Sequence, residues 1–363
     1  MASVGLLAAL ALAACDDRNP PVVRVGDAIP RTAKQPTLLD VIRPLLPVAA
    51  TPRLEIVPWT VPTIDLNVGD AAQARRFIAD ASVVAVVGHA GSKSTLHVEP
   101  MYREAGMPLI VPTATARALR NVGPDVFMLA PPDDAVGAYL VDQALHRPRQ
   151  PRIGLLYVAD PYGDGIRDGV VARLKSVNDS LAGEAALSGR ECEHQGEALR
   201  AIVTAFLRRS RPDVVLLALP QRATWCAIRQ LVQQQPGIEV ITSDSFVPLV
   251  GFPLSPAERA AVRVLAFWQP GTDSLTQRFV AQTRAVLGRD PEPSQALAFD
   301  AFRLVQAAVR EGHVTRRAVA RWLHELGTPG HPPFQGITGP IDFTAPRTTV
   351  MHLQSLGDSV PPP

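Results

Sequence analysis

Hydroxyl side chains follow two apolar segments of the sequence, and their placement predicts an anion-binding site. Ser92 comes after an apolar run and before a helical pattern that is expected to begin near Thr95. Free backbone N–H groups and the positive end of a helix dipole favour a negative charge there, and the Ser92 hydroxyl adds a donor. Thr113 and Thr115 follow the next apolar run, so they should lie at the same carboxyl edge of a parallel sheet. Helix capping is the alternative role for Ser92 and Thr115.

The motifs of common catalytic and cofactor sites are absent from the sequence. No glycine-rich phosphate loop and no Gly-x-Gly-x-x-Gly fingerprint follow the first expected strand. Residues 88–94 (Gly-His-Ala-Gly-Ser-Lys-Ser) lack the glycines that a nucleophile elbow needs two positions either side of Ser92, and the eight His residues include no His-x-x-x-His pair. Asp133 and Asp134 could form a carboxylate dyad, although their place before a helical segment also suits a helix N-cap. We therefore expect neither an enzyme nor a bound cofactor or metal.

Short β-branched runs alternate with segments of helical period from residue 22 onward. The alternation restarts after residues 133–134, which gives two successive sets of strands and helices. Such regular alternation predicts an α/β protein with mostly parallel sheets and two lobes. The strands expected in the first set are 22–26, 54–57, 83–88, 107–111 and 125–129, and those expected in the second are 153–157, 214–218, 239–242 and 262–267.

The first residues have the composition of an export signal. Residues 4–14 are apolar but too few to span a bilayer, and they end at Cys15 in Leu-Ala-Ala-Cys, which resembles the bacterial lipobox. We expect residues 1–15 to be a lipoprotein signal peptide with Cys15 lipidated, and residues 16–21 to be a polar tether. The protein would then be exported and anchored in a membrane, facing the periplasm or the cell exterior. A disordered start with an incidental cysteine is the alternative.

The remaining cysteines and the overall charge limit the environment and the partners. In an exported protein Cys192 and Cys226 could form one disulfide or remain two separate buried thiols. Hydrophobic residues make up 47% of the chain and charged residues 19%, which suits folded cores. The formal net charge of +2 supplies no strong field for nucleic acid. Beyond residue 15 no apolar run approaches the ~18 residues of a membrane-spanning helix.

Several motifs occur in the order found in one known family. The main stretch is Val-Val-Gly-His-Ala-Gly-Ser-Lys-Ser-Thr at 86–95 with Pro-Met-Tyr-Arg-Glu-Ala-Gly-Met-Pro-Leu-Ile-Val-Pro-Thr-Ala-Thr at 100–115. Together the motifs resemble those of the branched-chain amino acid (Leu/Ile/Val)-binding proteins of ABC importers, which are type I periplasmic binding proteins. The further matching segments are 127–133 (Phe-Met-Leu-Ala-Pro-Pro-Asp), 157–165 (Tyr-Val-Ala-Asp-Pro-Tyr-Gly-Asp-Gly), 212–216, 298–301 and 336–343.

The resemblance implies a two-lobed fold in which each lobe is a mostly parallel sheet flanked by helices. Three crossings would join the lobes, near Asp133, Phe267 and Gly339, and Asp133 is itself a candidate ligand-binding residue. The implied boundaries are 22–132 plus 268–337 for lobe one and 133–267 plus 338–356 for lobe two.

The resemblance also implies roles for individual residues. Ser92 would hold the α-carboxylate of the ligand, Thr115 would contact its carboxylate and ammonium, and Thr113 would offer a backbone carbonyl to the ammonium. From lobe two, Tyr162 would close over the ligand and Asp244 would be the acidic partner of the ammonium. A packing role for Tyr162 and a solvated turn at Asp244 are the alternatives left open.

Solute capture is therefore the expected function. A lipid-anchored receptor would bind an amino acid or a similar amphoteric solute between its lobes and deliver it to an ABC permease, with no nucleic-acid partner. The alternative is an envelope regulatory lipoprotein that uses the same fold for protein–protein contact without ligand. The segment 27–53 is shorter than in the family and lacks its glycine-rich turn, so no ligand role is assigned to residues 28–32.

Overall fold

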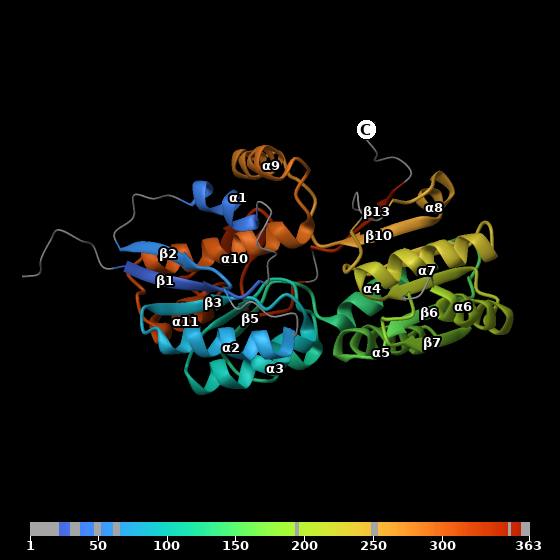
Figure 1. Cartoon of the computed structure of the whole chain (residues 1–363), viewed down its shortest axis with the longest axis horizontal. Helices are drawn as coiled ribbons and strands as arrows, with labels where there is room; N and C mark the ends of the chain where they lie inside the picture. Colours follow the sequence, from blue (N-terminus) through green and yellow to red (C-terminus); the bar gives the residue numbers. More distant parts are fainter. Residues whose placement is uncertain are drawn as a thin grey trace, which may run out of the picture.

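The computed structural model describes residues 22–29, 37–46, 52–60, 66–192, 196–247, 253–347 and 350–356, without the side chains of 66–68. The expected signal peptide, Cys15 and the tether lie outside these residues. Within the described ranges, no helix combines the length and apolar character needed to cross a membrane. Two lobes lie side by side along the longest axis of the molecule (Figure 1).

The first lobe is built on a sheet of five strands. Their order is β2–β1–β3–β4–β5, and every neighbouring pair is parallel. The central strand β3 is buried at every position, as expected for a strand covered by helices on both faces. The strands are β1 (Val22–Asp27), β2 (Arg53–Val57), β3 (Val83–Val87), β4 (Leu109–Val111) and β5 (Val126–Met128).

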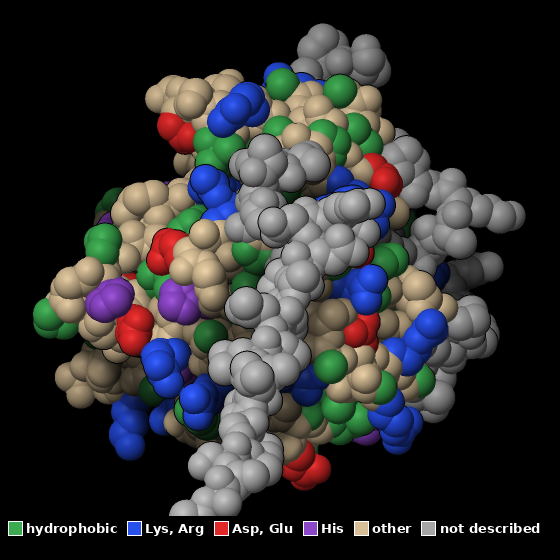
Figure 2. All heavy atoms as spheres, turned by 90° about the vertical axis from the view of Figure 1, so that its left-hand side faces the viewer, with side chains coloured by type: hydrophobic (Ala, Val, Ile, Leu, Met, Phe, Trp, Pro, Cys, Tyr) green, Lys and Arg blue, Asp and Glu red, His purple; other side chains and the backbone are tan. Residues whose placement is uncertain are grey.

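Helices from both ends of the chain cover this sheet. The returning helix α10 contacts β1 and β3, and α11 contacts β3. At the start of α11 the Arg316 guanidinium donates to the backbone carbonyls of Ile78 and Val83 at 2.9 and 3.1 Å. Acidic and basic side chains are interspersed over this end of the molecule (Figure 2). The helices are α1 (Leu38–Leu45), α2 (Leu66–Ala79), α3 (Ser92–Glu104), the 3-10 helix η1 (Arg117–Arg120), α9 (Ser274–Leu287), α10 (Pro293–Arg310) and α11 (Arg316–Glu325).

The second lobe is built on a sheet of six strands in the order β13–β10–β9–β8–β6–β7. Only the pairing of β13 with β10 is antiparallel. The α/β class with mostly parallel sheets is thereby confirmed. The strands are β6 (Ile153–Val158), β7 (Gly183–Leu187), β8 (Val214–Ala218), β9 (Glu239–Thr242), β10 (Val262–Ala266) and β13 (His352–Ser355). The helices are α4 (Asp133–Leu145), α5 (Pro161–Ser176), α6 (Glu197–Ser210), α7 (Gln221–Gln234) and α8 (Pro256–Ala261).

A disulfide settles which of the two cysteine alternatives applies. Cys192, which follows β7, is bonded to Cys226 of α7, and their Cα atoms are 6.1 Å apart. The bridge closes a loop of the second lobe with a sequence separation of 34 residues, which restricts the unfolded chain.

The hairpin of β11 (Phe334–Gly336) and β12 (Gly339–Ile341) corrects the expected third crossing. The buried carboxylate of Asp300 on α10 accepts hydrogen bonds from the backbone N–H and the hydroxyl of Thr338, at 2.8 and 2.7 Å. The Phe343 ring packs on Phe127, with ring centroids 4.9 Å apart. Residues 338–343 therefore lie with the first lobe, and the chain crosses after Phe343, not at Gly339.

Two buried side chains connect the three crossing segments. Trp268, on the second crossing, donates from Nε1 to the Ile337 carbonyl at 3.1 Å. Arg347, on the third crossing, donates to the Leu129 carbonyl on the first at 3.0 Å and to the Thr338 carbonyl at 2.7 Å. Burial lowers the pKa of Arg347 to about 10, so its guanidinium stays charged at neutral pH. The second and third crossings are thus both bonded to the loop of the β11–β12 hairpin, and the third is also bonded to the first; we call the three crossings with this loop the hinge.

Candidate functional site

A cavity of about 1100 Å³ lies between the lobes, and residues that follow the carboxyl ends of strands in both sheets line it. We call it the cleft. Ser92, Thr113 and Thr115 line it from lobe one, and Tyr162 and Asp244 line it from lobe two. The fold thus brings five of the predicted site residues together, as parallel strands with a shared carboxyl edge require.

Ser92 is the first residue of α3 and not its cap, because the N-cap is Gly91 and no side chain caps this end. The Ser92 hydroxyl oxygen accepts hydrogen bonds from the backbone N–H groups of Thr115 and Ala116 at 3.3 and 3.1 Å. Since these donors occupy the oxygen, the hydroxyl proton is directed to an acceptor elsewhere. The buried Thr115 hydroxyl is directed at the carboxyl of Asp133. The Ser92 hydroxyl can therefore serve a ligand, whereas the Thr115 hydroxyl already faces an acceptor.

The start of α3 provides backbone donors beside Ser92. The first helical bond runs from the Thr95 N–H to the Gly91 carbonyl at 3.0 Å, so the N–H groups of residues 92–94 have no acceptor within the helix. The Thr113 hydroxyl donates to the Ala90 carbonyl at 2.8 Å and holds the loop after β4 against the loop after β3. This end of the cleft is suited to an anion.

Asp133 lies beneath the cleft and does not line it. Its side chain is fully buried, and its carboxylate lies against Gly165, where an added Cβ would be 2.6 Å from Oδ2. Burial raises the pKa of Asp133 to about 8; a hydrogen bond from the Thr115 side chain lowers it in part, and the negative charge of Asp244 adds to the increase. The helix that follows is capped by Pro132 without a side-chain bond, so Asp133 does not act as the N-cap either.

Tyr162 reaches the cleft because α5 begins directly after β6. The Asp160 carboxylate caps the helix by accepting the N–H groups of Tyr162 and Gly163, both at 3.0 Å. A Cβ at position 163 would lie 1.9 Å from the Val158 carbonyl oxygen, so only glycine permits this close approach. The Tyr-Gly motif seen in the sequence thus has a steric cause.

Hydrogen bonds connect the side chains on the lobe-two wall with one another. The Tyr162 hydroxyl lies 2.7 Å from Ser243 Oγ and 3.0 Å from Asp244 Oδ1, and Ser243 Oγ lies 3.4 Å from Ser245 Oγ. Burial raises the pKa of Asp244 to about 6. Burial and the charge of Asp244 hold the pKa of Tyr162 well above its usual value. Near neutral pH this wall therefore presents an ionised carboxylate and a protonated phenol.

Five charged residues to which the sequence analysis gave no site role also line the cleft: Asp70, Lys93, Asp160, Arg190 and Glu292. Asp70 lies within α2 and does not directly follow a strand, so the rule that located the other site residues did not include it. Arg190 follows β7, an edge strand with few β-branched residues that was not predicted. Glu292 precedes α10, where Glu-Pro was a usable helix-start signal. No group of three or more His, Cys, Asp or Glu suited to a metal is found among the described residues.

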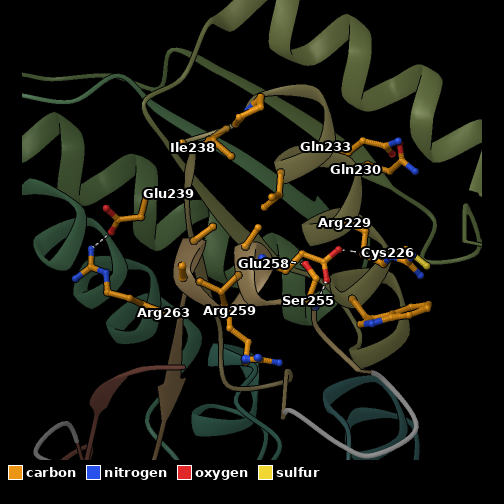
Figure 3. A pocket seen from close by; sticks show the side chains of 18 of the residues that line it. Cys226, Arg229, Gln230, Gln233, Ile238, Glu239, Ser255, Glu258, Arg259 and Arg263 are labelled. Atoms are coloured by element: carbon orange, nitrogen blue, oxygen red, sulfur yellow. Dashed lines mark hydrogen bonds and ion pairs between the residues drawn. The ribbon is translucent and has the colours of Figure 1, made fainter. Parts of the chain in front are cut away.

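A larger cavity of about 1460 Å³ lies on lobe two, against α7, α8 and the adjoining strands (Figure 3). Both of its acidic side chains are paired with arginines of the same lining, Glu239 with Arg263, and Glu258 with Arg229 at 3.6 Å. No predicted site residue lines it, and none of the buried unpartnered atoms of the described chain belongs to its lining. The cleft is the better candidate because it holds unsatisfied polar groups.

The family follows from a match to known proteins. Residues 67–355 match the family model described as periplasmic binding protein, which covers most of the chain. The chain therefore belongs to the periplasmic binding protein family, and the resemblance found in its sequence is confirmed. An amino acid binding protein from Pseudomonas aeruginosa is 29% identical over 107 residues, and this match spans 29% of each chain.

Solved structures share the two-lobed fold. An ABC transporter substrate-binding protein from Desulfitobacterium hafniense in complex with Leu has a TM-score of 0.71 and 20% identity, over 89% of this chain and 93% of that one. A branched-chain amino acid transporter substrate-binding protein from Streptococcus pneumoniae in complex with isoleucine has a TM-score of 0.72 and 17% identity, over 90% and 92%. A solute-binding protein from Rhodopseudomonas palustris in complex with benzoate has a TM-score of 0.71 and 16% identity, over 93% of both chains.

Proposed function

We propose that this chain is the solute-binding protein of an ABC importer and that it binds an amino acid or a similar small amphoteric solute in the cleft. The main observation behind the proposal is that the two walls of the cleft favour opposite charges: lobe one favours a negative group and lobe two a positive group. The start of α3 with Ser92 offers unused donors on lobe one, and Asp244 offers a carboxylate on lobe two. A molecule with a carboxylate and an ammonium satisfies both.

The ligands named for the similar structures share part of this chemistry. Leucine, isoleucine and benzoate all carry a carboxylate, and the first two also carry an ammonium. The lobe-one donors suit all three ligands. Asp244 favours those with an ammonium, because an ionised carboxylate beside benzoate would repel it.

Binding would couple to closure of the lobes about the hinge. We assign residues 22–132 and 268–343 to lobe one and residues 133–267 and 350–356 to lobe two. The solute carboxylate would dock on lobe one, and closure would bring Tyr162 and Asp244 over it. Closure removes water from the charge-assisted hydrogen bonds and thereby strengthens them. A regulatory protein without ligand has no need of unpartnered donors at the floor of the cleft, so the structural features favour solute capture.

The experiment is a thermal-shift screen of the purified chain against the standard amino acids and benzoate. A solute at about 100 times its Kd stabilises the folded state by about 2.7 kcal/mol, which raises Tm by several degrees. We expect at least one amino acid to raise Tm in this way. If no amino acid and no simple carboxylate changes Tm at millimolar concentration, the proposal is wrong and protein–protein contact becomes the better explanation.

We further propose that the protein is exported and held at the membrane by lipid on Cys15, for delivery to a permease. The apolar segment that ends in Leu-Ala-Ala-Cys supports this. Replacing the thiol in Cys15→Ser should release the full-length protein from the membrane fraction into the soluble fraction. The double variant Cys192→Ser/Cys226→Ser, which removes the other two cysteines without leaving an odd thiol, is the control and should leave the fractionation unchanged. Membrane association that persists in Cys15→Ser would contradict the anchor.

A further inference from the structure

Asp70 is a buried acidic group on the lobe-one wall of the cleft. It lies in α2 and is 1% exposed, yet it is part of the cleft lining. Its Oδ1 lies 2.7 Å from Nδ1 of His89, and its Oδ2 has no hydrogen-bond partner among the described residues. A buried carboxylate oxygen without a donor is costly, so its presence beside a binding cavity calls for an explanation.

His89 holds one oxygen of Asp70 in place. His89 is fully buried, its Nδ1 lies 2.7 Å from Asp70 Oδ1 and its Nε2 lies 3.1 Å from the Tyr102 hydroxyl. Burial and the negative charge of Asp70 raise the pKa of Tyr102, so its O–H remains a donor. Both ring nitrogens of His89 are thus engaged, and the second oxygen of Asp70 is left for a group from outside this cluster.

A single loop connects the neighbour of Asp70 with the anion site. His89, which contacts Asp70 and packs edge-on against Trp59, is followed by Ala90, Gly91 and Ser92. A Cβ added at Gly91 would meet only Ser94 Oγ, at 3.8 Å, so the space around Gly91 itself is open. Asp70 and Ser92 also line the same cleft, so one extended solute can contact both.

The charges of the cleft lining also favour a solute with a positively charged end. Four acidic residues line it against two basic ones: Asp70, Asp160, Asp244 and Glu292 against Lys93 and Arg190. The basic residue on lobe one, Lys93, adjoins Ser92, at the end of the cleft that suits a carboxylate. The rest of the lining favours positive groups.

We propose that Asp70 binds a cationic group at the far end of the solute, so that the cleft selects basic amino acids with a guanidinium or ammonium side chain. This inference rests on the proposed function, because it takes the solute carboxylate to lie at Ser92. The free Asp70 oxygen accepts a hydrogen bond from the solute cation, while His89 holds the other oxygen in place. The solute cation places a positive charge beside the Asp70 carboxylate, which strengthens the hydrogen bond between them.

The experiment compares L-arginine with L-citrulline, which has a nearly identical shape and a neutral end group, by calorimetry on the full chain. We expect the wild type to bind L-arginine at least about tenfold more tightly than L-citrulline. In Asp70→Asn, which can still accept from His89, the preference should fall below about threefold while L-citrulline binding is unchanged. Asp125→Asn, which removes a carboxylate of lobe one outside the cleft lining, is the control and should keep the preference.

The outcomes separate this inference from the proposed function. Equal wild-type affinities for L-arginine and L-citrulline, or a full preference retained in Asp70→Asn, would overturn the role of Asp70. Tightest binding of L-leucine would also overturn it and leave solute capture intact. Tightest binding of L-glutamate would assign the far end of the solute to Arg190 instead. If no amino acid binds the wild type, the proposed function and this inference both fail. The comparison of L-arginine with L-citrulline on the wild type needs no variant, so it tests the preference for a cationic solute even if Asp70→Asn does not fold.

Discussion

The two walls of the cleft differ in what their polar groups do in the absence of a solute. On lobe one, the Ser92 proton and the N–H groups that open α3 have no acceptor in the described structure. On lobe two, Tyr162 is hydrogen-bonded to Ser243 and Asp244. A solute can bind the first wall without breaking a protein hydrogen bond, whereas the second wall must exchange its own bonds. Lobe one should therefore bind first and contribute more to affinity.

Ser92→Ala should have the largest effect on this comparison. It removes the donor to the solute carboxylate and the oxygen that orders the N–H groups of Thr115 and Ala116. Loss of a hydrogen bond to a charged group costs about 1–3 kcal/mol, so Kd should rise by about 5- to 150-fold. Calorimetry with the amino acid found in the screen measures this change in Kd. Ser82→Ala, which removes a lobe-one hydroxyl outside the cleft lining, is the control, and an equally large loss of affinity there would contradict the role given to Ser92.

Asp244→Asn should have an intermediate effect that depends on pH. The pKa of Asp244 is raised to about 6, so its carboxylate is mostly protonated at pH 5 and mostly ionised at pH 7. Because only the ionised form attracts an ammonium, wild-type affinity should increase roughly tenfold between these values. The variant should bind about 5- to 20-fold more weakly at pH 7 and show a flat profile. A variant that keeps the pH dependence would assign the titration to another group, such as neighbouring Asp133.

Tyr162→Phe should have the smallest effect. Its hydroxyl already bonds within lobe two, so binding exchanges one hydrogen bond for another and the net loss is about 0.5–1 kcal/mol. We expect a two- to fivefold weaker Kd, seen in stopped-flow measurements mainly as faster dissociation, because the residue acts after docking. A loss as large as that of Ser92→Ala would mean that lobe two, not lobe one, provides the main half-site.

The sequence predicted the elements that bring the cleft residues together, since apolar runs such as 83–87 identify parallel strands and their carboxyl ends converge. The sequence analysis predicted that α3 begins near Thr95, three residues after its actual start, because the N-cap is Gly91 and the sequence has no capping side chain at that position. Strand β7 was missed because Gly-Glu-Ala-Ala-Leu has no β-branched residue. Asp70 could not be found, because its significance comes from His89, 19 positions away, and from packing that no local pattern encodes.

The hinge bonds of Arg347 and Trp268 have a mechanical consequence. Three independent connections would allow the lobes to twist, slide and bend relative to each other. Because the second and third crossings are bonded to the same hairpin loop, at Ile337 and Thr338, these bonds should oppose twisting and sliding of the lobes and favour bending at the crossings. Bending would bring Tyr162 and Asp244 toward Ser92. Under the proposed function, a solute too long for the space between these residues would hold the lobes further apart.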